Sequence, residues 1–155
     1  MRVDGVPCRT LRVAEDGSSV EIIDQTRLPH AFSIVALRTL EDAARAITTM
    51  QVRGAPLIGV TAAYGLCLAL RADPSDASLE RAGAALSATR PTAVNLRWAL
   101  GQMRAALAGV APAERSECAY AAAAALAEED VALCRAIGEH ERGLRVHALC
   151  AFEGE

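Results

Sequence analysis

The pattern of apolar residues changes once along this chain, near residue 39, and this change constrains the fold more than any other feature. Before it, short strand-like runs occupy positions 8–13, 19–24 and 32–37. Asp16-Gly17 lies between the first two runs, which is a good signal for a β-hairpin. Because the connections are too short for helical crossovers, the sequence predicts a small antiparallel meander.

After residue 39 the apolar residues recur at helical spacing. Thr39, followed by Glu41 and Asp42, is typical of a helix start, because a hydroxyl caps the first turn and acidic groups favour its dipole. Proline at the first turn and polar clusters between helices mark the further boundaries. The predicted helices begin at Thr39, Pro56, Ala77, residues 90–92 and Pro112, with the second, third and fifth ending near Leu70, Ala88 and His140.

A strand meander followed by an antiparallel helical bundle is an α+β arrangement. We expect one domain over residues 1–142, with strands at about 7–37 and helices at about 39–142, and a divergent tail at 143–155. The length of 155 residues is a common size for a single domain.

The composition excludes several classes of function. Charged residues make up 23% of the chain and the net charge is −3, so neither a polybasic nucleic-acid arm nor an acidic tail is present. All 16 basic residues are arginine, which excludes lysine chemistry within this chain. We find neither a signal-peptide pattern nor an apolar stretch of about 18 residues, and therefore expect a cytoplasmic protein without nucleic-acid or membrane partners.

The five cysteines are widely spaced and form no C-x-x-C pair, which argues against a disulfide framework or a structural zinc site. Cys67, Cys118 and Cys134 lie in alanine-rich helical patterns, where a thiol usually serves as a small apolar residue. His147 and Cys150 form an H-x-x-C without a partner base, which is not a nucleophile signature. The sequence predicts no metal site.

Residues 51–59 are the most informative stretch. Gly54 lies between Arg53 and the helix-starting Pro56, so the backbone can come close to a ligand. The free N–H groups of a helix start suit an anion, and an arginine fork matches phosphate. The alternative interpretation is an ordinary interhelical turn with an exposed arginine.

Residues 89–96 repeat this logic, because Arg90 precedes a predicted helix start and Thr92 is available as a cap or as a ligand hydroxyl. The alternative here is a capped, solvated helix start. The two motifs could converge on one phosphorylated ligand, since pockets need several converging polar groups. Trp98 is interpreted as a packing residue rather than a stacking platform. Asp24 and Gln25 are interpreted as a turn at the end of a strand, with cleft lining as the alternative.

Four segments, taken together, resemble one enzyme family. The chain is similar to the N-terminal region of the S-methyl-5-thioribose-1-phosphate isomerase family over about residues 1–141. That family shares a superfamily with the regulatory subunits of the initiation-factor nucleotide exchange complex and with ribose-1,5-bisphosphate isomerase. The segments are residues 19–26 (SVEIIDQT), 52–59 (VRGAPLIG), 90–96 (RPTAVNL) and 136–140 (AIGEH).

The resemblance implies an aldose–ketose isomerisation of methylthioribose 1-phosphate in methionine salvage, by a homodimer that uses neither a metal nor a nucleotide cofactor. By motif, it implies that Arg53, Gly54, Ala55 and Arg90 bind the sugar phosphate.

The resemblance also implies that the catalytic cysteine, in a T-H-C-N-A-G motif, and a catalytic aspartate belong to a second, Rossmann-like domain. Cys150 lacks the flanking Asn-Ala-Gly, so we assign no catalytic residue in this chain. We therefore expect an N-terminal fragment without turnover of its own. The alternatives are a non-catalytic regulatory module like the exchange-factor subunits, and a helical scaffold without a ligand.

Overall fold

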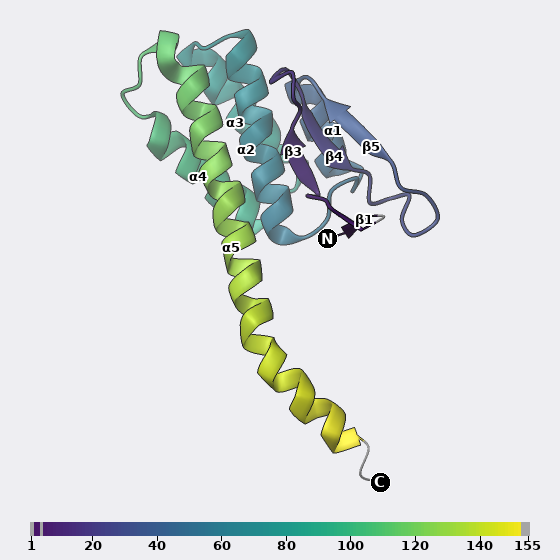
Figure 1. Ribbon diagram of the computed structural model, residues 1–155. Helices are drawn as coiled ribbons and strands as arrows, with labels where there is room; N and C mark the ends of the chain where they lie inside the picture. The colour runs from purple at the N-terminus through teal and green to yellow at the C-terminus, as the bar shows by residue number, and fades with distance from the viewer. Residues whose placement is uncertain (1, 4, 153–155) are drawn as a thin grey trace.

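The computed structural model describes the backbone of residues 2, 3 and 5–152 and the side chains of residues 5 and 8–140. Over these residues it forms five short strands followed by five helices, which confirms the predicted α+β fold (Figure 1). The strands are β1 (Arg2–Val3), β2 (Val6–Pro7), β3 (Leu11–Val13), β4 (Val20–Ile23) and β5 (Ile34–Leu37). The helices are α1 (Leu40–Thr48), α2 (Ala55–Ala72), α3 (Asp76–Thr89), α4 (Val94–Leu107) and α5 (Pro112–Phe152).

The antiparallel meander is formed by β3, β4 and β5 in that order. Leu11 pairs with Ile22, and Val20 pairs with Leu37, so these apolar side chains share the face that is buried against the helices. Each strand is shorter than the predicted run, because the β3–β4 ladder pairs three residues and the β4–β5 ladder pairs four. The β1–β2 hairpin was not predicted; it is a separate two-stranded sheet.

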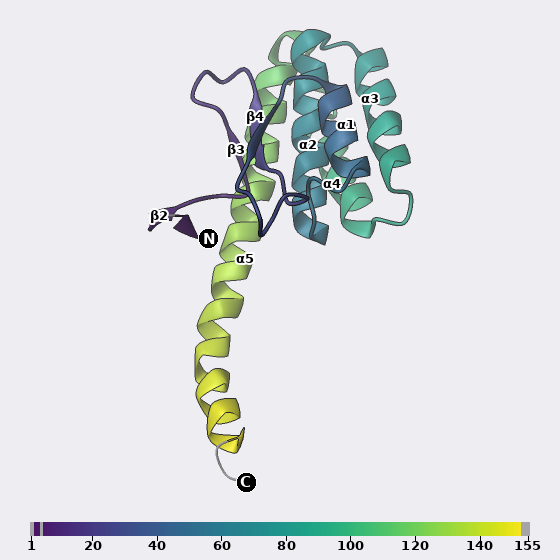
Figure 2. The same cartoon turned by 90° about the vertical axis from the view of Figure 1, so that its right-hand side faces the viewer.

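Helix α2 is the centre of the bundle and contacts all four other helices (Figures 1 and 2). Two glycines permit this close packing. A Cβ at Gly59 would lie 2.8 Å from the carbonyl oxygen of Asn95 on α4, and one at Gly65 would lie 2.8 Å from Cβ of Ala43 on α1. By length and apolar composition α2 could cross a membrane, but 67% of it is buried inside the fold, which accounts for its apolar character.

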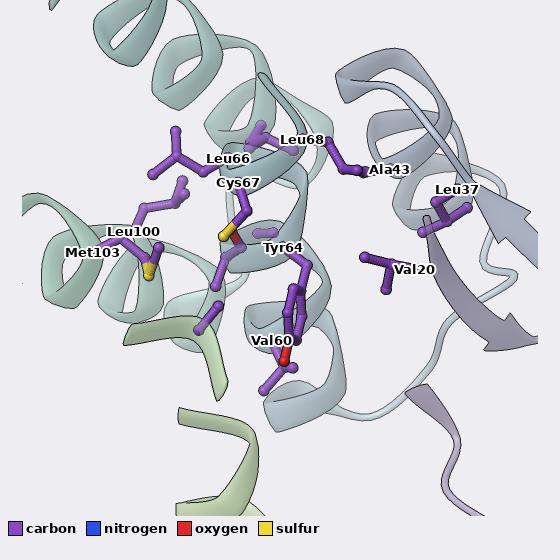
Figure 3. Close-up of a cluster of buried hydrophobic side chains, with 14 of the residues drawn as sticks. Val20, Leu37, Ala43, Val60, Tyr64, Leu66, Cys67, Leu68, Leu100 and Met103 are labelled. Atoms are coloured by element: carbon purple, nitrogen blue, oxygen red, sulfur yellow. The ribbon is translucent and has the colours of Figure 1, made fainter. Parts of the chain in front are cut away.

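The buried core joins α2 to the sheet and to α4 (Figure 3). Tyr64 lies with its ring centroid 6.2 Å from that of Tyr120, and burial raises the Tyr64 pKa to about 12. The Cys67 thiol is fully buried, donates to the Ala63 carbonyl at 3.2 Å and has its pKa raised by burial. Cys67 is therefore the small apolar residue that the sequence predicts. For Cys134 the same prediction is wrong, because its side chain is exposed on α5.

Helix boundaries depart from the prediction at two places. Helix α4 begins at Val94 rather than at residues 90–92, and its N-cap is Ala93. The reason is a turn in which the Ala93 N–H donates to the Arg90 carbonyl, 3.0 Å away, before the helix begins. The capping role of Thr92 is therefore wrong, whereas its alternative role as a ligand hydroxyl stays a prediction. Helix α5 continues past His140 and projects beyond the bundle in both views (Figures 1 and 2).

Candidate functional site

The two predicted anion-binding motifs meet at one cleft of about 520 Å³, which we call the arginine cleft. It lies between the start of α2 and the start of α4. All four residues that the family resemblance assigns to substrate binding line it, so the structure brings the two motifs together. The lining residues are Met50, Arg53, Gly54, Ala55, Ile58, Arg90, Thr92, Ala93, Val94 and Asn95.

Helix α2 opens onto this cleft without a side-chain cap. Its N-cap is Gly54, whose φ of 95° lies in the region that favours glycine. Among the described residues no side chain accepts from an N–H of the first turn as a cap, and no acidic residue lies in that turn. Pro56 has no N–H, so the backbone donors offered by the first turn are those of Ala55 and Leu57. These donors and the positive end of the helix dipole favour an anion.

Helix α4 begins in the same way. Its N-cap residue is Ala93, no described side chain forms a capping hydrogen bond there, and its first turn contains no acidic residue. The guanidinium of Arg97 donates to the Pro91 carbonyl, which holds the connection from α3 in place. Because Gly59 lets the Asn95 backbone touch α2, the two helix starts lie side by side at the cleft.

The positive charges of Arg53 and Arg90 are available to a ligand. Neither guanidinium forms an ion pair with a carboxylate among the side chains that the structure describes. Arg53 is exposed and Arg90 is half-buried. A guanidinium fork matches the oxygens of a phosphate, so the cleft combines two permanent charges with the backbone donors of two helices.

The loop that carries Arg53 is anchored to the sheet through Asp24. One oxygen of this buried carboxylate accepts from the Thr26 hydroxyl at 2.6 Å and from its N–H at 3.0 Å. The other accepts from Nε2 of Gln51 at 3.2 Å. These bonds, the Thr26 hydroxyl first among them, lower the Asp24 pKa. The turn role predicted for Asp24 is confirmed; its bond to Gln51 was missed, because nothing in the sequence links residues so far apart.

A second cleft of about 400 Å³, the apolar cleft, adjoins the first. Val94 and Asn95 line both clefts. Trp98 lines the apolar cleft and is 51% exposed, so its predicted packing role is wrong. It lies on the cleft face of α4, whereas Leu96, Leu100 and Met103 form the buried stripe. The remaining lining residues are Pro56, Gly59, Val60, Ala99, Leu126, Glu129, Asp130 and Leu133.

The other polar candidates do not assemble into a site. Among the residues that the structure describes, no three His, Cys, Asp or Glu side chains gather as possible metal ligands. His140 is exposed on α5, whereas the side chains of His147 and Cys150 lie outside the described residues. The predicted lack of a metal or cofactor stays a prediction.

Residues 51–144 of the chain match a family model described as the initiation factor 2 subunit family. The methylthioribose-1-phosphate isomerase of Methylocella silvestris is 61% identical over 140 residues, which are 90% of this chain and 38% of that protein. The isomerase of Methylorubrum populi is 60% identical over 153 residues, which are 99% of this chain and 41% of that protein. The chain thus spans about 40% of the length of these curated relatives.

Two solved structures share the fold. The translation initiation factor eIF-2B subunit delta from A. fulgidus superimposes with a TM-score of 0.73 at 36% identity, covering 81% of this chain and 38% of that one. The 5-methylthioribose 1-phosphate isomerase from Pyrococcus horikoshii OT3 has a TM-score of 0.72 at 35% identity, covering 79% of this chain and 36% of that one.

Proposed function

Because the chain belongs to the initiation factor 2 subunit family, we propose that it forms the phosphate-binding part of an aldose–ketose isomerase. The reaction converts S-methyl-5-thioribose 1-phosphate to S-methyl-5-thioribulose 1-phosphate in methionine salvage. Relatives of about 60% identity that carry the name methylthioribose-1-phosphate isomerase support this assignment.

The observation that carries the proposal is the convergence of Arg53, Gly54, Ala55 and Arg90 on the arginine cleft. The two guanidinium groups bind the phosphate oxygens, and the N–H groups at the starts of α2 and α4 donate to the same anion. Gly54 provides backbone without a side chain where the phosphate approaches, and its φ of 95° favours glycine at this position. The space in which a Cβ would lie is open.

The residues of this chain bind and orient the substrate rather than move its protons. Isomerisation requires an acid or base within hydrogen-bond reach of the sugar carbons. Among the described side chains, the arginine cleft is lined by neither a cysteine nor an aspartate. We propose that the 155-residue chain alone binds the sugar phosphate without turning it over. Formation of the ketose by the purified chain, measured in an assay of the product carbonyl, would contradict this.

Calorimetric titration with methylthioribose 1-phosphate and with inorganic phosphate tests the binding role. A hydrogen bond to a charged group contributes about 1.5–3 kcal/mol, so Arg53→Ala and Arg90→Ala should each weaken binding roughly 10- to 100-fold. Arg81→Ala is the matched control, because Arg81 lies on α3 and its exposed side chain pairs with Asp73. If Arg53→Ala and Arg81→Ala bound phosphate with equal affinity, Arg53 would not be a phosphate-binding residue.

The second candidate is a non-catalytic regulatory subunit, which the similarity to eIF-2B subunit delta favours. The isomerase relatives are more similar in sequence, at about 60% against 36% identity, and we therefore rank the enzyme first. A regulatory module predicts a stable oligomer whose thermal unfolding is indifferent to phosphate. Thermal unfolding with and without phosphate separates the two, because only a phosphate-binding chain is stabilised by the ligand. Light scattering tests the homodimer that the resemblance implies.

A further inference from the structure

We propose that the apolar cleft holds the methylthio end of the substrate whose phosphate lies in the arginine cleft, so that Trp98 and Leu133 select the 5-substituent. This inference rests on the proposed function. It goes beyond it by assigning the second cleft, whose residues Trp98 and Leu133 lie outside the four family segments, to one chemical group.

Continuity between the two clefts is the first argument. Val94 and Asn95, in the first turn of α4, line both clefts. On α2 the lining residues also run from one cleft into the other, because Ala55 lines the arginine cleft and Pro56 the apolar cleft. A single ligand anchored by its phosphate at the helix starts can therefore extend into the apolar cleft.

The character of the lining is the second argument. Three large apolar side chains remain exposed there: Val94 at 66%, Trp98 at 51% and Leu133 at 57%. A small apolar group that enters the cleft removes this surface from water. A thioether suits it in particular, since polarizable sulfur makes favourable contacts with aromatic rings.

Charge fixes the direction in which the ligand lies. Glu129 and Asp130 on α5 line the apolar cleft, whereas Arg53 and Arg90 line the arginine cleft. The two carboxylates repel a phosphate from the apolar cleft and can accept hydrogen bonds from ribose hydroxyls. The geometry therefore favours a neutral 5-substituent and disfavours a second phosphate at that position.

Trp98 is the single tryptophan of the chain, so its fluorescence reports on this cleft alone. The experiment titrates the 155-residue chain with methylthioribose 1-phosphate, ribose 1-phosphate and ribose 1,5-bisphosphate, with calorimetry in parallel. We expect the Trp98 emission to change with the methylthio compound and not with ribose 1-phosphate. We expect affinity about 10-fold tighter for the methylthio compound, as one apolar group in a pocket supplies. The bisphosphate should gain nothing from its second phosphate.

Two variants on α5 form a matched pair. Leu133 and Ile137 are both 57% exposed, but only Leu133 lines the apolar cleft. Leu133→Asn should reduce the preference for the methylthio compound over ribose 1-phosphate to about twofold, and Ile137→Asn should leave the wild-type preference. Equal effects of the two variants would overturn the inference.

The remaining outcomes are also decisive. If all three sugars bind equally and Trp98 stays silent, this inference falls and the proposed function stands. If no sugar phosphate binds, both fall together. If the Trp98 emission depends on protein concentration rather than on ligand, a second copy of the chain covers the cleft, and the inference is overturned.

Discussion

Two pairs of helix starts in this molecule are built in opposite ways. Helix α1 begins with a capping box, in which the Thr39 hydroxyl accepts from the Asp42 N–H and the Asp42 carboxylate accepts from the Thr39 N–H. Helix α3 begins with Ser75, whose hydroxyl accepts from the Ser78 N–H at 3.1 Å, and with Asp76 in its first turn. Helices α2 and α4 have neither a described side-chain cap nor a first-turn acid.

The difference separates what stabilises the fold from what binds a ligand. A capped helix satisfies its own orphan N–H groups and neutralises its dipole within the protein. An uncapped start gives up about 1 kcal/mol of this local stabilisation and leaves donors and partial positive charge for an outside anion. Both uncapped starts open on the arginine cleft, and both capped starts lie away from it.

The largest effect is expected from the contact that aligns the two uncapped starts. Gly→Ala in a helix usually stabilises by about 0.4–1 kcal/mol. At Gly59, however, the new Cβ would lie 2.8 Å from a backbone oxygen of α4 and 3.2 Å from Cβ of Ala99. The helices must separate, so Gly59→Ala should cost about 1–3 kcal/mol of unfolding free energy and weaken phosphate binding.

The control for this substitution is Gly101→Ala, in the interior of α4, where a Cβ meets nothing within 4 Å. That variant should be stabilised by about 0.4–1 kcal/mol in urea unfolding. If both variants gained stability, the close approach of α2 and α4 would not be what aligns the two starts.

An acidic residue placed in the first turn of α2 should make this helix start resemble those of α1 and α3. We expect Ala55→Glu to raise the unfolding free energy of the free protein by about 0.3–1 kcal/mol, because a carboxylate favours the helix dipole. The same carboxylate occupies the arginine cleft, so the affinity for phosphate should fall about 10-fold or more. Ala77→Glu, in the first turn of α3, should bring a similar gain in stability and leave phosphate affinity unchanged. Undiminished phosphate binding by Ala55→Glu would break the comparison.

The sequence predicts local features of this fold well. The cap at Thr39, the helix start at Pro112 and the buried stripe of α4 all follow from signals within a few residues, and the structure confirms them. The start of α4 was misplaced, because a turn from Arg90 to Ala93 competes with the helix for the same residues. The predicted strands are longer than the observed ones, because a strand ends where the neighbouring strand stops pairing with it and not where its apolar pattern ends.

The candidate site was partly foreseen. Arg53 and Arg90 could be singled out from their place before helix starts, and the structure brings both to one cleft. The exposure of Trp98 and the bond between Asp24 and Gln51 were not foreseen, because both depend on how distant elements pack. Sequence periodicity describes one element at a time, whereas a cleft is made by several.

Removing the cap of α3 and adding one to α4 should have opposite effects on stability. Ser75→Ala removes the cap of α3 and should cost about 1 kcal/mol of unfolding free energy without changing phosphate affinity. Ala93→Ser should do the reverse at α4, gaining stability while its hydroxyl takes up an N–H that the anion would otherwise use. Thermal unfolding with and without phosphate measures both effects in one experiment. A gain in phosphate affinity for Ala93→Ser would contradict our interpretation of the uncapped start.

The smallest effect is expected from the carboxylate that holds the loop before α2. Hydrogen bonds lower the Asp24 pKa in the folded protein, so its stabilisation is present above the unfolded pKa of about 4 and is lost as pH falls through the lower, folded value. Urea unfolding should therefore show Asp24→Asn less stable than wild type at pH 7, with the difference shrinking below pH 4.

Asp16→Asn is the control, since Asp16 also has a lowered pKa but bonds to Ser18 in the exposed hairpin turn. Both variants should share the acid behaviour, but only Asp24→Asn should weaken phosphate binding at pH 7, because only Asp24 bonds to Gln51 in the Arg53 loop. Equal phosphate affinities for the two variants would show that the uncapped start of α2 holds its geometry without the sheet.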